Sequence, residues 1–197
     1  QDELSHLQRD VGLCDISPSG KLLIQGEGLE TYLAEIFTDT DQLQVGRVSQ
    51  QDLGTGSEAQ TVLLARLAGD EAIVLTTSSK TAMALELLNA TSERCAHLVD
   101  ITSALAGVGI VGPLAQRLLA TVAELDTSTK AFPDMSCAQT EVAEIHGMLL
   151  RHDVADLPNF ELYFGREYGE YMWHVLMEAG EKYNTVPFGT EALAYLQ

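Results

Sequence analysis

The feature of this sequence that most constrains its fold is an internal duplication. Residues 13–17 read LCDIS and return in the second half of the chain as residues 98–102, which read LVDIT. A repeat this long exceeds the period of a solenoid and is typical of a duplicated half-domain. We therefore expect two similar lobes closed on each other, with pseudo-repeats at about residues 13–90 and 98–180 of a single domain over residues 1–197.

Later segments repeat in the same order and support the duplication. The pairs are residues 39–40 and 126–127 (DT in both), residues 59–61 and 138–140 (AQT in both), and residues 72–75 and 160–163 (AIVL and FELY). No linker-like composition separates the two copies, so the sequence predicts one compact body.

Hydrophobic periodicity predicts short strands and amphipathic helices in both copies. In the first copy we expect strands at 14–17, 21–25, 61–65 and 72–75, helices at 29–37 and after Ser78 or Ser79, and a polar loop over 38–58. In the second copy we expect strands near 98–102 and at 108–111, 142–150 and 160–164. We expect one helix to begin at Pro113 and a later helix to end at Gly180. Helices mixed with antiparallel hairpins predict an α+β fold.

Composition excludes several classes of partner. Asp and Glu total 29 against 11 Lys and Arg, which gives a formal net charge of −18. Such a surface repels phosphate backbones and anionic lipid, so we expect neither nucleic acid nor membrane partners, whereas a basic partner subunit fits.

The 3 cysteines show no paired spacing, which argues against a disulfide framework or a zinc site and favours the cytoplasm. No apolar run reaches the roughly 20 residues that a membrane span needs.

The usual signals of catalysis and nucleotide binding fail on their context. Residues 107–112 (GVGIVG) match G-x-G-x-x-G, but residues 108–111 are themselves a predicted strand, and the first copy reads LIQG at the matching place. The histidines are scattered without a recognisable nucleophile, and His152-Asp153 is typical of a solvated turn. We therefore expect no metal site.

Three segments, together with the two-lobed pattern, resemble the folate-binding domain of aminomethyltransferases, the T-protein of the glycine cleavage system, and its sarcosine oxidase relatives. Residues 15–21 (DISPSGK) resemble the family opening D-V-S-x-x-G-K. Residues 151–163 (RHDVADLPNFELY) lie without a gap on R-x-x-Y-T-G-E-x-G-F/Y-E-L/I-Y. Residues 186–193 (VPFGTEAL) resemble P-x-G-T-E-A-M/L of the oxidase branch. The resemblance covers nearly the whole chain and implies a T-protein-like fold of duplicated strand-helix half-domains.

The resemblance implies tetrahydrofolate as the cofactor, bound weakly or not at all, and Glu161, Arg151 and Tyr163 as cofactor-binding residues. Glu161 stands at the glutamate that the family directs at the pterin ring, whose adjacent N–H donors a carboxylate can accept as a pair. Val154 replaces the family's tyrosine, and Leu193 replaces an arginine that helps the T-protein bind folate. These departures predict a weakened site.

Plain strand alternation offers another interpretation of Glu161. It would turn Phe160, Leu162 and Phe164 toward the core, and Glu161 and Tyr163 outward. In that case the glutamate is a surface residue without a ligand.

The family's catalytic aspartate, from a G-G-I-x-D-D segment, should fall in residues 50–60. Residues 50–58 read QQDLGTGSE instead, where only Asp52 or Glu58 could stand in. A methylene-transfer reaction needs a carboxylate near the reacting nitrogen. We therefore expect no catalytic residue in this chain.

The length of the chain favours one branch of the family. Aminomethyltransferases and oxidase α subunits continue into a C-terminal β-barrel, which we expect to be absent here. The γ subunit of heterotetrameric sarcosine oxidase has a comparable length and packs against a larger catalytic chain. The resemblance thus implies a non-catalytic, γ-like subunit of one-carbon or N-methyl amine metabolism, with a larger flavoprotein as partner.

Two alternatives stay open: a tetrahydrofolate-dependent aminomethyltransferase and a stand-alone folate-binding regulator. A relative of the folate-binding iron–sulfur maintenance proteins is disfavoured, because their K-G-C-Y-x-G-Q-E signature is absent.

Overall fold

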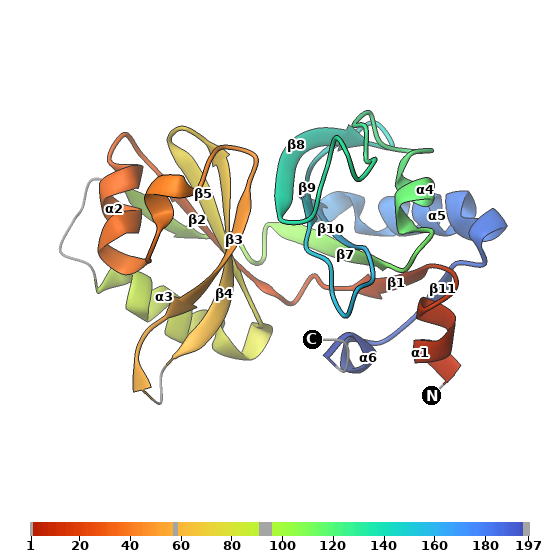
Figure 1. Cartoon of the computed structure of the whole chain (residues 1–197), viewed down its shortest axis with the longest axis horizontal. Coiled ribbons are helices and arrows are strands. Elements are labelled where there is room, and N and C mark those ends of the chain that lie inside the picture. The colour runs from red at the N-terminus through yellow and green to blue at the C-terminus, as the bar shows by residue number, and fades with distance from the viewer. Residues whose placement is uncertain (1, 57–58, 91–95, 195–197) are drawn as a thin grey trace. The chain divides into compact units, whose positions relative to one another are not determined.

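The chain divides into two compact units, each built around an open β-sheet (Figure 1). The computed structural model describes residues 2–56, 59–90 and 96–194. The first unit is Pro18–Ser103, and the second unit combines Gln1–Ser17 with Ala104–Gln197. The predicted α+β class is confirmed, whereas the single domain over residues 1–197 stays a prediction.

The first unit has the strand order β3-β4-β5-β2-β6, with every neighbouring pair antiparallel. Its strands are β2 (Gly20–Gln25), β3 (Val48–Leu53), β4 (Gln60–Ala68), β5 (Glu71–Thr76) and β6 (His97–Asp100). Its helices are α2 (Leu29–Ile36) and α3 (Thr81–Asn89), with short 3-10 turns at η1 (Thr40–Gln42) and η3 (Ser78–Lys80). Leu29 and Leu33 of α2 and Leu88 of α3 are fully buried in one hydrophobic core with the sheet.

The second unit has the order β11-β1-β7-β10-β9-β8. Its strands are β1 (Gly12–Asp15), β7 (Leu105–Val111), β8 (Ser136–Val142), β9 (Ile145–Arg151), β10 (Asn159–Gly165) and β11 (Val186–Pro187). Its helices are α1 (Asp2–Leu7), α4 (Ala115–Leu119), α5 (Gly169–Gly180) and α6 (Thr190–Ala194), with 3-10 turns at η4 (Arg166–Tyr168) and η5 (Glu181–Tyr183). Helices α4 and α5 bury Leu118, Met172 and Leu176 in one core with the sheet.

The two sheets repeat one strand order, which confirms the duplicated strand–helix fold. The order β3-β4-β5-β2-β6 recurs as β8-β9-β10-β7-β1, and β11 is added beyond β1. The register repeats as well: Asp15 of β1 lies opposite Val108, just as Asp100 of β6 lies opposite Leu22.

The repeated D-I-S/T segments lie where the chain passes from one sheet to the other. Strand β1 begins the first repeat but pairs in the second unit, and β6 begins the second repeat but pairs in the first. In both copies the aspartate accepts a hydrogen bond from the amide two residues later, Ser17 N to Asp15 Oδ1 and Thr102 N to Asp100 Oδ1, each 2.9 Å. The hydroxyl in turn accepts a backbone amide of the neighbouring paired strand, Gly107 of β7 for Ser17 and Lys21 of β2 for Thr102, each at 3.0 Å. Each repeat therefore gives its first strand to the other sheet.

One of the sequence echoes holds and another is wrong. Residues 72–75 lie opposite β2 as residues 160–163 lie opposite β7, so these two segments correspond. Residues 59–61, in contrast, lead into β4, whereas residues 138–140 lie in β8, the counterpart of β3. The shared AQT is a coincidence of letters.

The predicted loop over residues 38–58 is wrong in part, because it contains β3. This strand pairs with β4 at the edge of the sheet and buries Val48 and Leu53 while its other residues are mostly polar. An edge strand with one covered face needs few apolar residues, so its hydrophobic signal is weak.

The single strand predicted over residues 142–150 is a hairpin of β8 and β9. The chain turns at Ala143 (φ 50°) and Glu144 (φ 65°), both in the left-handed region. Such two-residue turns usually carry Asn-Gly or Asp-Gly, and neither residue here gives that signal. Helix α5 ends at Gly180 as predicted.

Candidate functional site

Strand β10 is the central feature of the site, because it lies inside the second sheet between β7 and β9. Glu161 and Tyr163 lie two residues apart and so share one face of this strand. Both are buried, with 9% and 2% of their surfaces exposed. The outward orientation predicted from alternation is therefore wrong: β10 is covered on both faces, so alternation on it does not separate core from solvent.

The two residues form one hydrogen-bonded pair. The Tyr163 hydroxyl donates to Glu161 Oε2 at 2.7 Å. Burial, reinforced by the charge and the hydrogen bond of Glu161, raises the pKa of Tyr163 well above its ordinary value. The tyrosine therefore stays protonated and available as a donor, while Glu161 is the acceptor.

Glu161 is a buried carboxylate without a cationic partner in the described part of the chain. Among the described residues, its side chain accepts a hydrogen bond from Tyr163 and from no other group. A buried carboxylate ordinarily needs a countercharge or several donors. The unused acceptor capacity of Glu161 is what makes this position a candidate ligand site.

Two glycines of β7 lie opposite the pair. Gly107 faces Tyr163 and Gly109 faces Glu161 across the antiparallel ladder. A Cβ at Gly107 would lie 2.9 Å from the Tyr163 ring and 3.0 Å from Ile16, which is too close, whereas one at Gly109 would meet its nearest atom at 3.5 Å. Gly107 thus leaves the space that the tyrosine ring fills. In the sequence, these glycines stand out only as part of the G-x-G-x-x-G string of residues 107–112.

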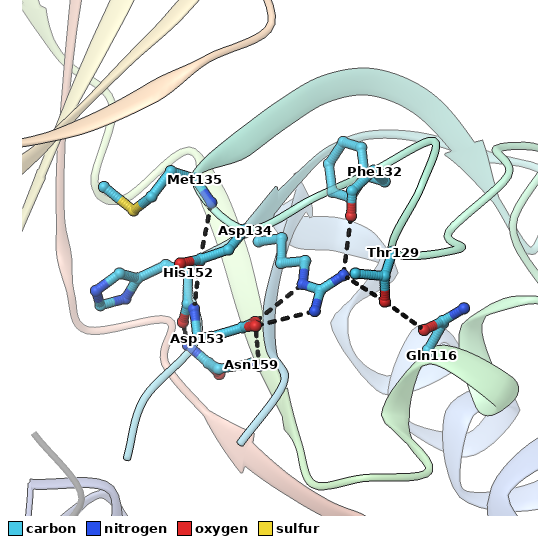
Figure 2. Close-up of polar contacts among 9 residues, drawn as sticks. Gln116, Thr129, Phe132, Asp134, Met135, His152, Asp153 and Asn159 are labelled. Atoms are coloured by element: carbon cyan, nitrogen blue, oxygen red, sulfur yellow. Dashed lines mark hydrogen bonds and ion pairs between the residues drawn. The ribbon is translucent and has the colours of Figure 1, made fainter. Parts of the chain in front are cut away.

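Arg151, at the end of β9, is committed to a different set of partners (Figure 2). Its guanidinium forms a bidentate pair with Asp153, with Nε to Oδ1 and Nη2 to Oδ2 both at 2.9 Å. Its Nη1 donates to the Phe132 carbonyl at 3.0 Å and to Thr129 Oγ1 at 3.3 Å. These contacts occupy most of the N–H donors of the guanidinium. Direct contact between Arg151 and a cofactor stays a prediction.

The Arg151 network fixes the segment that leads into β10. Asp134 Oδ1 accepts the Asp153 amide at 2.8 Å, and the Asn159 side chain donates to the His152 carbonyl at 3.1 Å. Figure 2 draws these contacts as dashed lines among Asp134, His152, Asp153 and Asn159. Sequence reasoning missed Asp153 as the partner, because the spacing of two residues does not show that the chain turns the carboxylate onto the guanidinium.

The duplication supplies a counterpart for Arg151. Leu64 and Leu149 correspond across the two ladders, which makes Arg66 of β4 the equivalent of Arg151. Arg66 is equally buried and donates to the carbonyls of Ala68 and Gly69 at 2.9 and 2.6 Å. In both copies a buried arginine holds a connection between strands.

The region expected to hold a catalytic carboxylate presents Asp52 on β3. Asp52 is exposed and accepts the Thr61 hydroxyl at 3.2 Å across the ladder. Glu58 lies outside the described residues. Val154 is buried in a turn closed with Leu157.

A separate pocket of about 340 Å³ opens on the face of the second sheet that α5 covers. Its lining includes Asp15, Ser17, Phe164 and Trp173, and does not include Glu161.

Within the described residues, no group of three or more His, Cys, Asp or Glu side chains is placed to hold a metal ion. Among the helices that the structure describes, none is long and apolar enough to span a bilayer.

Two open sheets share one strand order, and a central strand of one of them carries a buried carboxylate. This is the duplicated α+β domain expected from the resemblance to the aminomethyltransferase folate-binding domain. Comparison with protein families gives the same class. The chain belongs to the GCVT N-terminal domain family, whose model matches residues 1–197.

Curated relatives carry two names. The chain is 27% identical to the sarcosine oxidase subunit alpha of Rhizobium meliloti, over 99% of the chain and 21% of the relative. It is 30% identical to the aminomethyltransferase of Thermus thermophilus, over 89% of the chain and 51% of the relative. The chain therefore spans between a fifth and about half of the length of these relatives.

Solved structures confirm the fold. The glycine cleavage system aminomethyltransferase T of Bartonella henselae matches with a TM-score of 0.83 at 17% identity, over 99% of this chain and 52% of that chain. A chain of the heterotetrameric sarcosine oxidase of Corynebacterium sp. U-96 matches with a TM-score of 0.69 at 17% identity, over 91% of this chain and 88% of that chain.

Proposed function

We propose that this chain is a folate-binding-fold subunit of one-carbon or N-methyl amine metabolism that retains a weak pterin site and performs no group transfer itself. The observation that carries the proposal is the Glu161 carboxylate, which is buried, lacks a cationic partner among the described residues, and is engaged there by Tyr163. A ligand with neighbouring N–H donors would satisfy it.

The chemistry of this donor set fits the edge of a pterin ring. Glu161 would accept the pterin N–H groups, and Tyr163 would hold the carboxylate in one orientation through its hydroxyl. Arg151 would support the site from a distance, because its pair with Asp153 orders the segment before β10. Tetrahydrofolate, when bound, supplies ring nitrogens that carry one-carbon groups.

The proposal assigns no catalytic residue. A transferring site needs a second carboxylate beside the reacting nitrogen. Asp52 is exposed on an edge strand and pairs with Thr61, which suits a surface residue. Val154 offers no hydroxyl where the family has a tyrosine, so binding should be weak as well.

The subunit role draws on the family relationships. The relatives named sarcosine oxidase subunit alpha match nearly all of this chain, and a chain of a heterotetrameric sarcosine oxidase is matched over 88% of its own length. We propose a larger flavoprotein as the partner. The excess of acidic residues, 29 against 11 basic ones, suits a partner with a basic contact surface.

Affinity purification from the native source tests the subunit role. A tag on this chain should recover a stoichiometric larger chain that carries flavin absorbance. Recovery of this chain alone would contradict the proposal.

A single-turnover assay tests the alternative of a true aminomethyltransferase. The purified chain, mixed with tetrahydrofolate and an aminomethyl donor, should form no methylene-tetrahydrofolate. Turnover that disappears in Asp52→Asn would establish the enzyme instead.

A further inference from the structure

The two units differ at the outer edge of two equivalent strands, β1 in the second unit and β6 in the first. In the second unit β1 pairs with β7 on one side and, in parallel, with β11 on the other. In the first unit the equivalent strand β6 pairs with β2 alone, and it ends the sheet. Within the described residues, nothing is hydrogen-bonded to the outer edge of β6.

The hydrogen bonds of β11 define what such an edge can accept. The Val186 amide donates to the Val11 carbonyl at 3.2 Å, and the Phe188 amide donates to the Leu13 carbonyl at 2.9 Å. Leu98 takes the place of Leu13 in the duplication, because residues 98–102 repeat residues 13–17. An incoming strand would therefore meet the Leu98 carbonyl as Phe188 meets that of Leu13.

The outward direction of the Leu98 groups follows from the ladder itself. The Ile101 amide donates inward, to the Lys21 carbonyl of β2, at 2.9 Å. Backbone groups alternate in direction along a strand, so those of Val99 also point inward, and those of Leu98 and Asp100 point outward. Among the residues that the structure describes, the outward donors and acceptors of Leu98 and Asp100 thus have no backbone partner.

The equivalent strands β6 and β1 also differ in the exposure of their side chains. Val99 is 46% exposed, whereas Cys14, at the equivalent place in β1, is 1% exposed. An apolar side chain beside an open edge is a template for strand addition unless it is covered or charged. Strand β1 ends in Asp15 and β6 in Asp100, and that charge does not prevent β1 from accepting β11.

We propose that the outer edge of β6 is a docking site for an extended segment of the larger partner subunit, which adds to the first sheet as β11 adds to the second. The proposal rests on the subunit role proposed above. The segment should carry a basic residue near Asp100, because the edge ends in a carboxylate on a chain of net charge −18. The same charge repels a second copy of this chain, which makes self-association through β6 unfavourable.

A matched pair of variants tests the site in the native complex. Val99→Lys places a charge on the edge strand, whereas Val45→Lys places one at another exposed valine of the first unit, outside any strand. We expect Val99→Lys to weaken recovery of the large subunit at least tenfold and Val45→Lys to change it less than twofold. Both variants should keep the thermal midpoint of the wild-type chain.

Hydrogen exchange locates the contact. The amides of Leu98 and Asp100 should exchange rapidly in the isolated chain and become protected in the complex. A complex that forms normally with Val99→Lys and leaves these amides exposed would overturn the docking site while leaving the subunit role intact. A dimer of this chain alone that protects them would overturn the hetero-subunit assignment.

A synthetic peptide decides the point if no complex is recovered, the result that contradicts the subunit role. The probe is residues 184–190 of this chain (NTVPFGT), the segment that contains β11, extended by two lysines at one end. Protection of Leu98 and Asp100 at millimolar peptide, lost in Val99→Lys, would support a strand-accepting edge. No protection at that concentration would overturn it.

Discussion

The Tyr163 hydroxyl donates a 2.7 Å hydrogen bond to Oε2 of Glu161, two residues away on the same buried strand. The bond joins the implied pterin-binding glutamate to a neighbour that stays protonated. It therefore keeps the carboxylate an acceptor and fixes its orientation before any ligand arrives. Preorganised acceptors of this kind lose little freedom when they bind.

The raised pKa of Tyr163 predicts a loss of stability at high pH. Burial, followed by the charge and hydrogen bond of Glu161, raises it well above 10.0, the ordinary value at which an unfolded tyrosine ionises. The folded state therefore holds this proton more tightly. The stabilisation is complete below about pH 10 and is lost as the pH rises through the folded-state pKa.

Unfolding titrations in the alkaline range check this prediction. Tyr163→Phe should flatten the decline of unfolding free energy above pH 10, whereas Tyr168→Phe, at an exposed tyrosine, should leave it unchanged. Tyr32 needs a separate variant, because burial and then Glu35 raise its pKa to about 12. Equal slopes for wild type and Tyr163→Phe would contradict the assignment.

Gly107 and Gly109 should respond very differently to alanine. A Cβ at Gly107 would press on the Tyr163 ring at 2.9 Å, while the nearest atom at Gly109 would be 3.5 Å away. Overpacking of this kind costs about 1–3 kcal/mol, so Gly107→Ala should lower the free energy of unfolding by that amount. Gly109→Ala should be nearly neutral. Denaturant unfolding measures both, and equal effects would show that Gly107 does not accommodate the ring.

Asp153 should matter more for stability than its position in a loop suggests. Asp153→Asn removes the charge that balances the buried Arg151 guanidinium, which should cost about 3 kcal/mol. The equivalent arginine of the first repeat offers the control. Glu30, which pairs with Arg66 at 3.4 Å, has a side chain 86% exposed, so Glu30→Gln should cost less than about 0.5 kcal/mol. Comparable losses would contradict the difference between the two networks.

Sequence patterns predicted the architecture well where they rested on repetition and amphipathic spacing. The repeat at Asp15 and Asp100 marks structurally equivalent turns, and the apolar face ending at Gly180 marks α5. They failed where burial does not follow composition. Gln51 is buried on a largely polar edge strand, and Ala143 takes a left-handed conformation without a glycine signal.

The site was harder to predict than the fold, because the covering of β10 on both faces is a tertiary property. Alternation places Glu161 and Tyr163 outward, and nothing in the local sequence contradicts it. The family motif alone pointed to Glu161 as more than a surface residue. Arg151 was singled out by the same motif, but its bidentate partner Asp153 depends on a loop geometry that spacing does not encode.

Titration calorimetry with tetrahydrofolate tests the central claim most directly. The wild-type chain should bind with a dissociation constant in the micromolar to millimolar range, and Glu161→Gln should weaken binding at least tenfold, because it removes the charge that accepts the pterin N–H groups. Glu178→Gln, at an exposed glutamate of α5, should bind as the wild type does. Absence of binding heat in the wild type at millimolar tetrahydrofolate, or equal affinities for wild type and Glu161→Gln, would contradict a pterin site at Glu161.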